Sequence, residues 1–213
     1  MVETMIKLLG RQTSGNVQKV IFLLEELAIP YSREDYGRQF GNTQTPEYKA
    51  LNPNAKVPTV LDGDLSIWES HTILRYLTAK AGSDLGGGSL ADKTQVERWM
   101  DWMLASLNTP YVAVFKDSKK APEERAADFQ AQADDMITQL RILDAQLGGK
   151  DFVALDRFTL ADVALAPVVA RCLDFPVERP AFANLDKWRA SVAERPAFQV
   201  AVGKTPSTIA KAV

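Results

Sequence analysis

The sequence predicts an α/β domain followed by an all-helical domain, and three observations carry this prediction. In the first part of the chain, short apolar runs alternate with stretches of helical periodicity. Residues 81–90 read A-G-S-D-L-G-G-G-S-L, a composition that is typical of linkers. After this break, strand-like patterns almost vanish. We therefore expect domains at residues 1–80 and 91–213, with residues 81–90 as the linker between them.

In the first domain, changes in the spacing of apolar residues mark the elements. Runs that are short or alternating predict strands, and spacings of three and four predict helices with one buried stripe. An Asp62-Gly63 step between two apolar runs predicts a hairpin turn. The predicted strands lie at 5–9, 31–36, 57–61 and 65–68, the helices at 16–27 and 70–80, and a long loop with one helical turn at 37–50. This order predicts a thioredoxin-like domain with a mixed four-stranded sheet.

The second domain is predicted to be a helical bundle. Prolines at 110, 122 and 176–180 mark breaks or bends. Thr159 and Asp162 have the spacing of a capping box, in which a hydroxyl and an acid satisfy the first N–H groups of a helix. The helical segments are 91–115, 123–147, 159–173 and 185–193.

Composition excludes several classes of function. The net charge of −2 gives no electrostatic footprint for nucleic acid or an anionic membrane. No apolar run approaches the roughly 18 residues of a membrane span, and the first ten residues lack the features of a secretory signal. The single cysteine, Cys172, excludes an internal disulfide and a thiol zinc site. We expect a soluble, cytoplasmic protein without a metal.

The stretch from Asn52 to Ser70 departs most from an ordinary core. Pro58 precedes an apolar run, where it would interrupt a central strand, so Val57 is expected on a loop that enters a sheet edge. A cis bond before Pro58 would turn the backbone groups of Val57 outward. Glu69 and Ser70 stand at the start of a predicted helix, beside its free N–H groups.

These residues resemble the glutathione site of the soluble, cytosolic-type glutathione S-transferase family. The segment N-P-N-A-K-V-P at 52–58, followed by E-S at 69–70, resembles that site in residue types and spacing. S-G-N-V-Q-K-V at 14–20 resembles the S/T-x-P/N-x-x-K/R-V segment of the bacterial and theta-like members. F-T-L-A-D at 158–162 resembles the buried capping box of the family's core helix, although V-A-L-D-R-F before it replaces the usual glycine-containing approach. The resemblance spans both domains.

The junction of the first strand and first helix carries the candidate thiol-activating group. Ser, Thr and Asn are common N-cap residues, so simple capping is one interpretation of Thr13, Ser14 and Asn16. A hydroxyl there can also donate a hydrogen bond to a thiolate, which the helix N-terminus favours. The resemblance implies that Ser14 activates the thiol of glutathione and that Asn16 supports it. Thr13 remains a competitor, and no catalytic cysteine is needed.

The resemblance also implies how the rest of glutathione binds. Glu69 and Ser70 suit the γ-glutamyl end, because a helix N-terminus binds a carboxylate and an acid binds the ammonium. The backbone of Val57 can pair with the cysteinyl backbone. Lys56 can meet the glycine carboxylate, or it can be an ordinary solvated lysine. The candidate glutathione-binding residues are Asn16, Phe40, Lys56, Val57, Pro58, Glu69 and Ser70.

Other candidates lie on helices. The family's first long helix in the second domain lines the electrophile pocket, although the same residues would be ordinary core in any bundle. His71, the single histidine, is expected at the surface, at the ligand rim or at a subunit contact, and Cys172 in the core. The candidate pocket residues are Leu107, Tyr111, Val112 and Phe115.

The sequence thus predicts a homodimeric glutathione transferase of the detoxification type. Bound glutathione would ionise at Ser14 and attack a hydrophobic electrophile. The alternatives on the same scaffold are a glutathione-dependent isomerase, dehalogenase or peroxidase. A further alternative is a non-catalytic glutathione-binding or interaction module.

Overall fold

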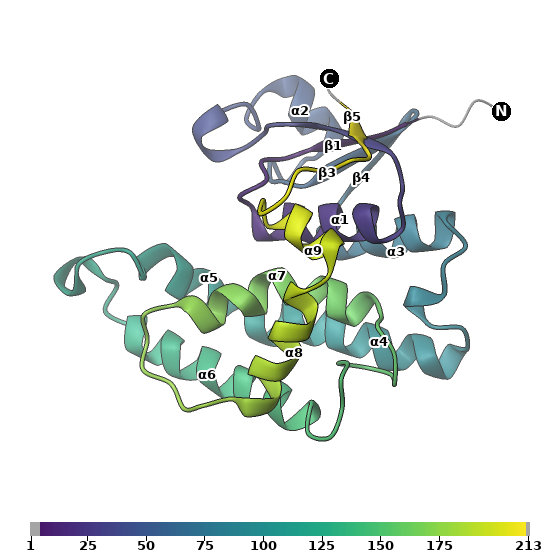
Figure 1. Ribbon diagram of the computed structural model, residues 1–213. Helices are drawn as coiled ribbons and strands as arrows, with labels where there is room; N and C mark the ends of the chain where they lie inside the picture. Colours follow the sequence, from purple (N-terminus) through teal and green to yellow (C-terminus); the bar gives the residue numbers. More distant parts are fainter. Residues whose placement is uncertain (1–4, 212–213) are drawn as a thin grey trace. The chain divides into compact units, whose positions relative to one another are not determined.

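The structure, a computed structural model, describes residues 5–211, which form two compact units (Figure 1). The first unit combines the described residues up to Ser83 with those from Ala193 onward. The second unit is continuous and runs from Asp84 to Val192. The first unit is therefore assembled from both ends of the described chain.

The first unit contains a mixed sheet of five strands in the order β4-β3-β1-β2-β5. The strand β1 pairs in parallel with β2 and antiparallel with β3, and β3 and β4 form the hairpin. The short strand β5 pairs in parallel with β2. The strands are β1 (Ile6–Leu9), β2 (Tyr31–Glu34), β3 (Thr59–Asp62), β4 (Leu65–Trp68) and β5 (Ala210–Lys211).

The fifth strand corrects the predicted four-stranded sheet and the predicted extent of the helical domain. The sequence predicts an all-helical domain over 91–213, but the described residues from Ala193 onward belong to the same unit as the sheet. Two residues are too few to show the alternation that marks a strand. The strand β5 exists only through its pairing with β2, in which Ala210 lies opposite Tyr31. This pairing joins residues that are far apart in the sequence.

Helices of the first unit pack on one another as well as on the sheet. The helix α1 contacts α3 and α9, and Figure 1 shows the yellow α9 beside the purple α1. The rings of Phe22 and Phe198 meet edge to face at 5.3 Å, and Arg195 forms an ion pair with Glu26. The helices are α1 (Gly15–Glu26), α2 (Pro46–Leu51), α3 (Ser70–Lys80) and α9 (Pro196–Ala201).

The segment predicted as a loop at 37–50 is more ordered than expected. It contains a 3₁₀ turn at Arg38–Phe40 and enters α2 at Pro46. Thr45 caps this helix by accepting a hydrogen bond from the Tyr48 N–H at 3.2 Å. Proline at the first helical position and a threonine cap are standard start signals, so α2 could have been predicted.

The second unit is all-helical within the described residues. The helix predicted over 91–115 is interrupted by a π-helical turn, because Pro110 has no N–H to donate to the preceding turn. The helix predicted from 123 begins later, since the Asp117 carboxylate accepts a bond from the Ala126 N–H at 2.8 Å and holds a turn there. The helices are α4 (Leu90–Trp102), the π turn (Met103–Leu107), α5 (Asn108–Asp117), α6 (Phe129–Gln146), α7 (Leu160–Asp174) and α8 (Ala183–Ala193), with 3₁₀ turns at Asp84–Gly86 and Pro122–Glu124.

The core of the second unit forms around α7, whose start is fixed by a buried carboxylate. Asp162 accepts hydrogen bonds from the N–H and the hydroxyl of Thr159 at 3.0 and 3.1 Å. It also accepts from the Val153 N–H at 3.0 Å and the Trp188 Nε1–H at 2.9 Å. The predicted capping box is confirmed, and Asp162 in addition ties α8 and the preceding loop to α7. Cys172 is buried on the same helix, as predicted.

Candidate functional site

Ser14 is the N-cap of α1. Its backbone is extended, with φ −82° and ψ 125°, and its C=O accepts a bond from the Gln18 N–H at 2.9 Å. The residue is 9% exposed, whereas Thr13 and Asn16 beside it are exposed. Among the described residues, the Ser14 hydroxyl makes no capping hydrogen bond. The backbone alone forms the start of the helix, and the hydroxyl is available to a ligand.

Val57 lies on the loop before β3, and its peptide bond to Pro58 is cis. Within the described residues, its N–H and C=O make no backbone hydrogen bond. A Cβ atom on Gly10 would lie 3.4 Å from Val57 Cβ and 2.5 Å from Val17 Cγ2. Glycine at position 10 therefore allows this loop and α1 to meet at the end of β1.

Two buried side chains hydrogen-bond to the backbone just before Val57. The Tyr48 hydroxyl and the Asn52 Nδ2 amide both donate to the Lys56 C=O, at 2.7 and 2.9 Å. The same two groups lie 2.9 and 3.0 Å from Thr59 Oγ1. Tyr48 and Asn52 are buried, whereas the Lys56 side chain is exposed. The loop is thus positioned by buried polar contacts, which sequence reasoning missed although both residues lie close by in the chain.

Glu69 and Ser70 start α3. Glu69 is the N-cap and has φ 67° and ψ 115°, a left-handed conformation that is strained for a residue other than glycine. Its carboxylate accepts a bond from Asn54 Nδ2 at 3.1 Å. Ser70 is the first helical residue and is buried. The first turn of α3 thus presents N–H groups beside an exposed acid and a hydroxyl, which can bind the carboxylate and the ammonium of an amino acid.

His71 is buried, which corrects the expectation that it lies at a surface, a ligand rim or a subunit contact. It is 2% exposed, and its Nε2 lies 3.1 Å from the Nζ of Lys19, which is 0% exposed. Burial lowers the pKa of Lys19 to about 7, while the charge of Glu69 raises it. Sequence reasoning missed Lys19 as a feature of the site. The available signal was a lysine inside the apolar stripe of a helix.

Phe40 is placed differently from the other candidates. It ends the 3₁₀ turn at Arg38–Phe40 and is 42% exposed. The elements that carry the other candidate residues contact one another. The helix α1 contacts α3, and Val57 on the loop before β3 lies against Gly10 at the end of β1. Ser14, Val57, Glu69 and Ser70 therefore lie at the ends of contacting elements of one unit.

In the second unit, the candidate pocket residues belong to an aromatic cluster. The Tyr111 and Phe115 rings lie 5.9 Å apart, and both pack on Phe175, at 6.1 and 6.4 Å. The Arg171 guanidinium lies 6.0 Å from the Phe115 ring centre. Sequence reasoning missed Phe175 because it directly follows α7, outside any periodic pattern.

Of the four predicted pocket residues, two are buried and two are partly exposed to solvent. Leu107 is fully buried and Tyr111 is nearly so. Val112 and Phe115 are partly exposed. Leu107 is thus a core residue of this unit, and Val112 and Phe115 are the members of the set that a small molecule can reach.

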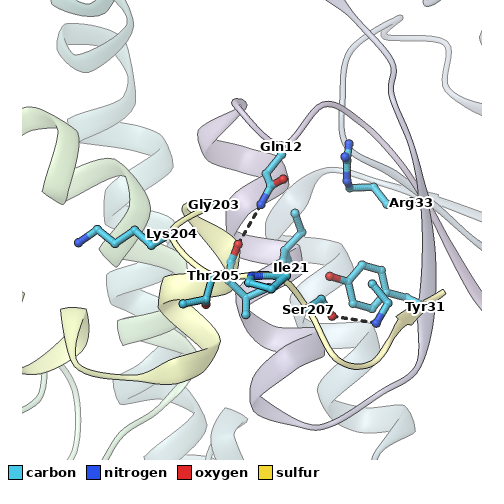
Figure 2. A pocket seen from close by; sticks show the side chains of 11 residues that line it. Gln12, Ile21, Tyr31, Arg33, Gly203, Lys204, Thr205 and Ser207 are labelled. Atoms are coloured by element: carbon cyan, nitrogen blue, oxygen red, sulfur yellow. Dashed lines mark hydrogen bonds between the residues drawn. The ribbon is translucent and has the colours of Figure 1, made fainter. Parts of the chain in front are cut away.

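A separate cavity of about 400 Å³ lies in the first unit (Figure 2). Its lining comes from α1, β2 and the C-terminal residues, and Gln12 Nε2 donates to the Val200 C=O at 2.9 Å across one side. In Figure 2 the Lys204 side chain points away from Tyr31 and Arg33. Arg33 donates to the Gly10 C=O at 3.0 Å and pairs with Asp35. The cavity contains none of the predicted site residues.

Two further properties concern the described residues as a whole. They contain no cluster of three or more His, Cys, Asp and Glu side chains that could hold a metal ion. Over the same residues, no helix has both the length and the apolar character of a membrane span.

Known protein families match each half of the chain, and known proteins match nearly the whole of it. The family description "Glutathione S-transferase, N-terminal domain" matches residues 5–79, and "Glutathione S-transferase, C-terminal domain" matches residues 100–196. Glutathione S-transferase GstB of Escherichia coli (strain K12) is 34% identical over 203 residues, which cover 93% of this chain and 98% of that protein. Glutathione S-transferase 4 of Zea mays is 30% identical over 90% of this chain and 89% of its own length.

A similar solved structure is the theta class glutathione S-transferase from Xanthomonas axonopodis pv. citri with glutathione bound. Its TM-score is 0.89 and its identity 33%, and the match covers 96% of this chain and 100% of that one. The predicted combination of a thioredoxin-like sheet and a helical domain agrees with this fold. The family matches and the relatives extend over both units of the structure. The chain therefore belongs to the glutathione S-transferase family of enzymes.

Proposed function

We propose that this protein is a glutathione transferase in which Ser14 activates the thiol of bound glutathione. The observation that carries the proposal is the Ser14 hydroxyl, which sits at the start of α1 without a capping bond among the described residues. It can donate a hydrogen bond to a sulfur anion there, and the helix N-terminus adds a favourable field. The S–H bond breaks, its electron pair stays on sulfur and the proton passes to a base. The thiolate then forms a C–S bond at an electrophilic carbon, and a leaving group departs from that carbon with its bonding electron pair, or a double bond opens where the reaction is an addition.

The energy required is within reach of these two interactions. A thiol with a pKa of about 8.5 is only a few per cent ionised at pH 7. Lowering the pKa by about two units makes it mostly thiolate and requires about 2.7 kcal/mol of differential stabilisation. One hydrogen bond to an anion contributes about 1.5–3 kcal/mol and the helix terminus about 0.3–1 kcal/mol.

The other contacts to glutathione would come from the start of α3 and from the loop before β3. The N-terminus of α3 with Ser70 would bind the γ-glutamyl carboxylate, and Glu69 its ammonium. The N–H and C=O of Val57 would pair with the cysteinyl backbone. Lys56 is exposed and would reach the glycine carboxylate. The glutathione bound to the Xanthomonas relative supports this ligand.

We assign the electrophile to the partly exposed aromatic surface of the second unit. Phe115 and Val112 offer apolar area, and the Arg171 charge near the Phe115 ring favours an aromatic or anionic substrate group. A homodimer, a cytoplasmic location and a role in detoxification belong to the same proposal and rest on the family resemblance of the sequence.

The decisive experiment is a pH titration of the thiolate ultraviolet band of bound glutathione. We expect a thiol pKa lowered by about one unit or more, equivalent to about 1.4 kcal/mol, and a loss of this shift in Ser14→Ala. Thr13→Ala is the matched control and should keep the shift. Binding with an unshifted thiol pKa would instead indicate a non-catalytic module, and a shift lost only in Thr13→Ala would transfer the role to Thr13.

A further inference from the structure

Lys19 and His71 form a buried contact to which the mechanism above gives no role. Their Nζ and Nε2 atoms lie 3.1 Å apart, and the residues are 0% and 2% exposed. Buried lysines are normally paired with an acid, because an uncompensated charge in a dry interior is costly. Here the hydrogen-bonded partner is a second base.

The pair links the two helices whose first residues belong to the proposed ligand site. Lys19 is in the second turn of α1, which begins after Ser14, and side chains on a helix lean toward its N-terminus. His71 follows Ser70 in the first turn of α3. The contact therefore joins the two helix starts that would hold the thiolate and the γ-glutamyl group.

The pair can hold one proton beyond its neutral form but not two. Two positive charges at this separation would repel strongly in a buried site. Burial lowers the pKa of Lys19 to about 7, and Glu69 opposes this. The protonation of Lys19 is thus near balance at neutral pH, and one new negative charge nearby shifts it.

Several other charged side chains lie on the elements around α1 and α3. Glu69 is the acid that acts on Lys19, and it also accepts a bond from Asn54. Arg75 follows one turn after His71 on α3 and is partly exposed. Ion pairs among the described residues of these elements include Glu26 with Arg195 next to α9 and Asp62 with Lys80 at the end of α3. On the sheet, Lys7 pairs with Glu34, and Arg33 pairs with Asp35 just after β2.

We propose that the Lys19–His71 pair is a proton store for the glutathione site: it is uncharged in the free protein near pH 8 and gains a proton when glutathione binds as the thiolate. This inference rests on the function proposed above. The S–H bond of glutathione breaks, its electron pair stays on sulfur, and an N–H bond forms at the pair. Part of the thiol proton is then retained by the protein and not released to the solvent. Lys19 is 0% exposed, so it acts as a positioning residue, through the charge it carries.

The size of the effect follows from the pKa of about 7. If the thiolate raises the pKa of Lys19 by about one unit, its protonated fraction at pH 8 rises from about a tenth to about a half. About four tenths of a proton then stays on the protein for each thiolate formed. At pH 6 the free pair is already mostly protonated, so the retained fraction falls toward zero.

The test compares two quantities for glutathione binding to the whole protein. The thiolate formed is measured from its ultraviolet band. The protons released are measured by calorimetric titration in buffers that differ in ionisation enthalpy. S-methylglutathione, which has no thiol proton, measures the exchange caused by the rest of the ligand and is subtracted. We expect fewer protons released than thiolates formed at pH 8, and equal amounts at pH 6.

Two variants of Lys19 separate charge from proton uptake. Lys19→Arg keeps a permanent charge, so we expect equal protons and thiolates at pH 8 and an unchanged low thiol pKa. Lys19→Met removes the charge, so we expect equal amounts and a thiol pKa higher by about one unit, by reciprocity of the coupling. If Lys19→Met does not fold, wild type and Lys19→Arg decide the question between them.

Two outcomes would overturn the inference, and they differ. Equal protons and thiolates in the wild type at pH 8 would refute the proton store and leave the role of Ser14 intact. Failure to form any thiolate band with glutathione would refute the proposed function and the proton store with it.

Discussion

The hydroxyl of Ser14 stands where a serine would ordinarily cap a helix, but it makes no such bond among the described residues. A side chain that only capped α1 would be replaceable by other capping groups at little cost. A side chain that donates to a sulfur anion would not, because only the charged state of the ligand benefits from it. These two roles predict different effects on turnover and on binding.

We predict that Ser14→Ala lowers turnover about tenfold or more and changes glutathione affinity only modestly. A tenfold loss corresponds to about 1.4 kcal/mol, the size of one hydrogen bond that strengthens as the thiol ionises. Steady-state kinetics at saturating glutathione measures it, with Ser14→Thr as the variant that restores a hydroxyl. A full-speed Ser14→Ala enzyme would remove Ser14 from the mechanism.

The lowered pKa of Lys19 leads to a second prediction, on how the free energy of unfolding depends on pH. The pKa of this group is about 7 in the folded protein and ordinarily 10.5. Between these values the unfolded chain binds more protons than the folded one, so the contribution of Lys19 to the free energy of unfolding rises with pH. Relative to Lys19→Met, the wild type should gain about 2 kcal/mol between pH 7 and pH 9. Urea denaturation at both pH values measures this gain, and a constant difference would contradict the lowered pKa.

At the scale of elements, α7 shows how a buried carboxylate organises its surroundings. Asp162 receives four hydrogen bonds, from Thr159, Val153 and Trp188. Burial raises the pKa of Asp162, and the donated bonds oppose this. The carboxylate joins the start of α7 to α8 and to the loop before it, so its loss leaves several buried donors unsatisfied.

We therefore predict that Asp162→Ala lowers the free energy of unfolding by about 3 kcal/mol or more, because each buried donor left without a partner costs about 1–3 kcal/mol. The matched control is Asp174→Ala at the other end of α7, where the exposed pair with Arg189 should contribute less than about 1 kcal/mol. Chemical denaturation compares the two variants. Equal losses would show that Asp162 is no more than a local cap.

At the scale of the whole molecule, the first unit depends on contacts between the two ends of the described chain. The rings of Phe22 and Phe198 pack at 5.3 Å, and β5 pairs with β2. Both contacts join the sheet and α1 to residues that follow the second unit in the sequence. The stability of the first unit therefore depends on residues far from it along the chain.

Phe198→Ala tests this dependence. We expect a loss of about 3–5 kcal/mol, the usual cost of removing a buried phenylalanine from a core, because Phe198 is 6% exposed and packs on α1. Thermal or chemical unfolding measures the loss. Ile142→Ala, at a position that is 46% exposed, is the control and should stay within about 0.5 kcal/mol of the wild type.

Local sequence was enough to predict most elements of the fold. Apolar spacing marked α1 and α3, the Asp62-Gly63 step marked the hairpin, and the hydroxyl–acid pair marked the start of α7. The family resemblance rested on similar short segments. What could not be predicted depends on distant contacts: the pairing of β5 with β2, the burial of His71 against Lys19, and the packing of Phe175 on Tyr111.

The return of the chain to its first unit has a consequence for protein synthesis. The ribosome produces β1, α1 and α3 first, but α9 and β5, which complete that unit, only after the whole of the second unit. Domains generally fold as units while the chain emerges. Here the continuous second unit can finish folding during translation. The first unit stays incomplete, with the face of α1 that contacts α9 uncovered, until α9 and β5 have left the exit tunnel.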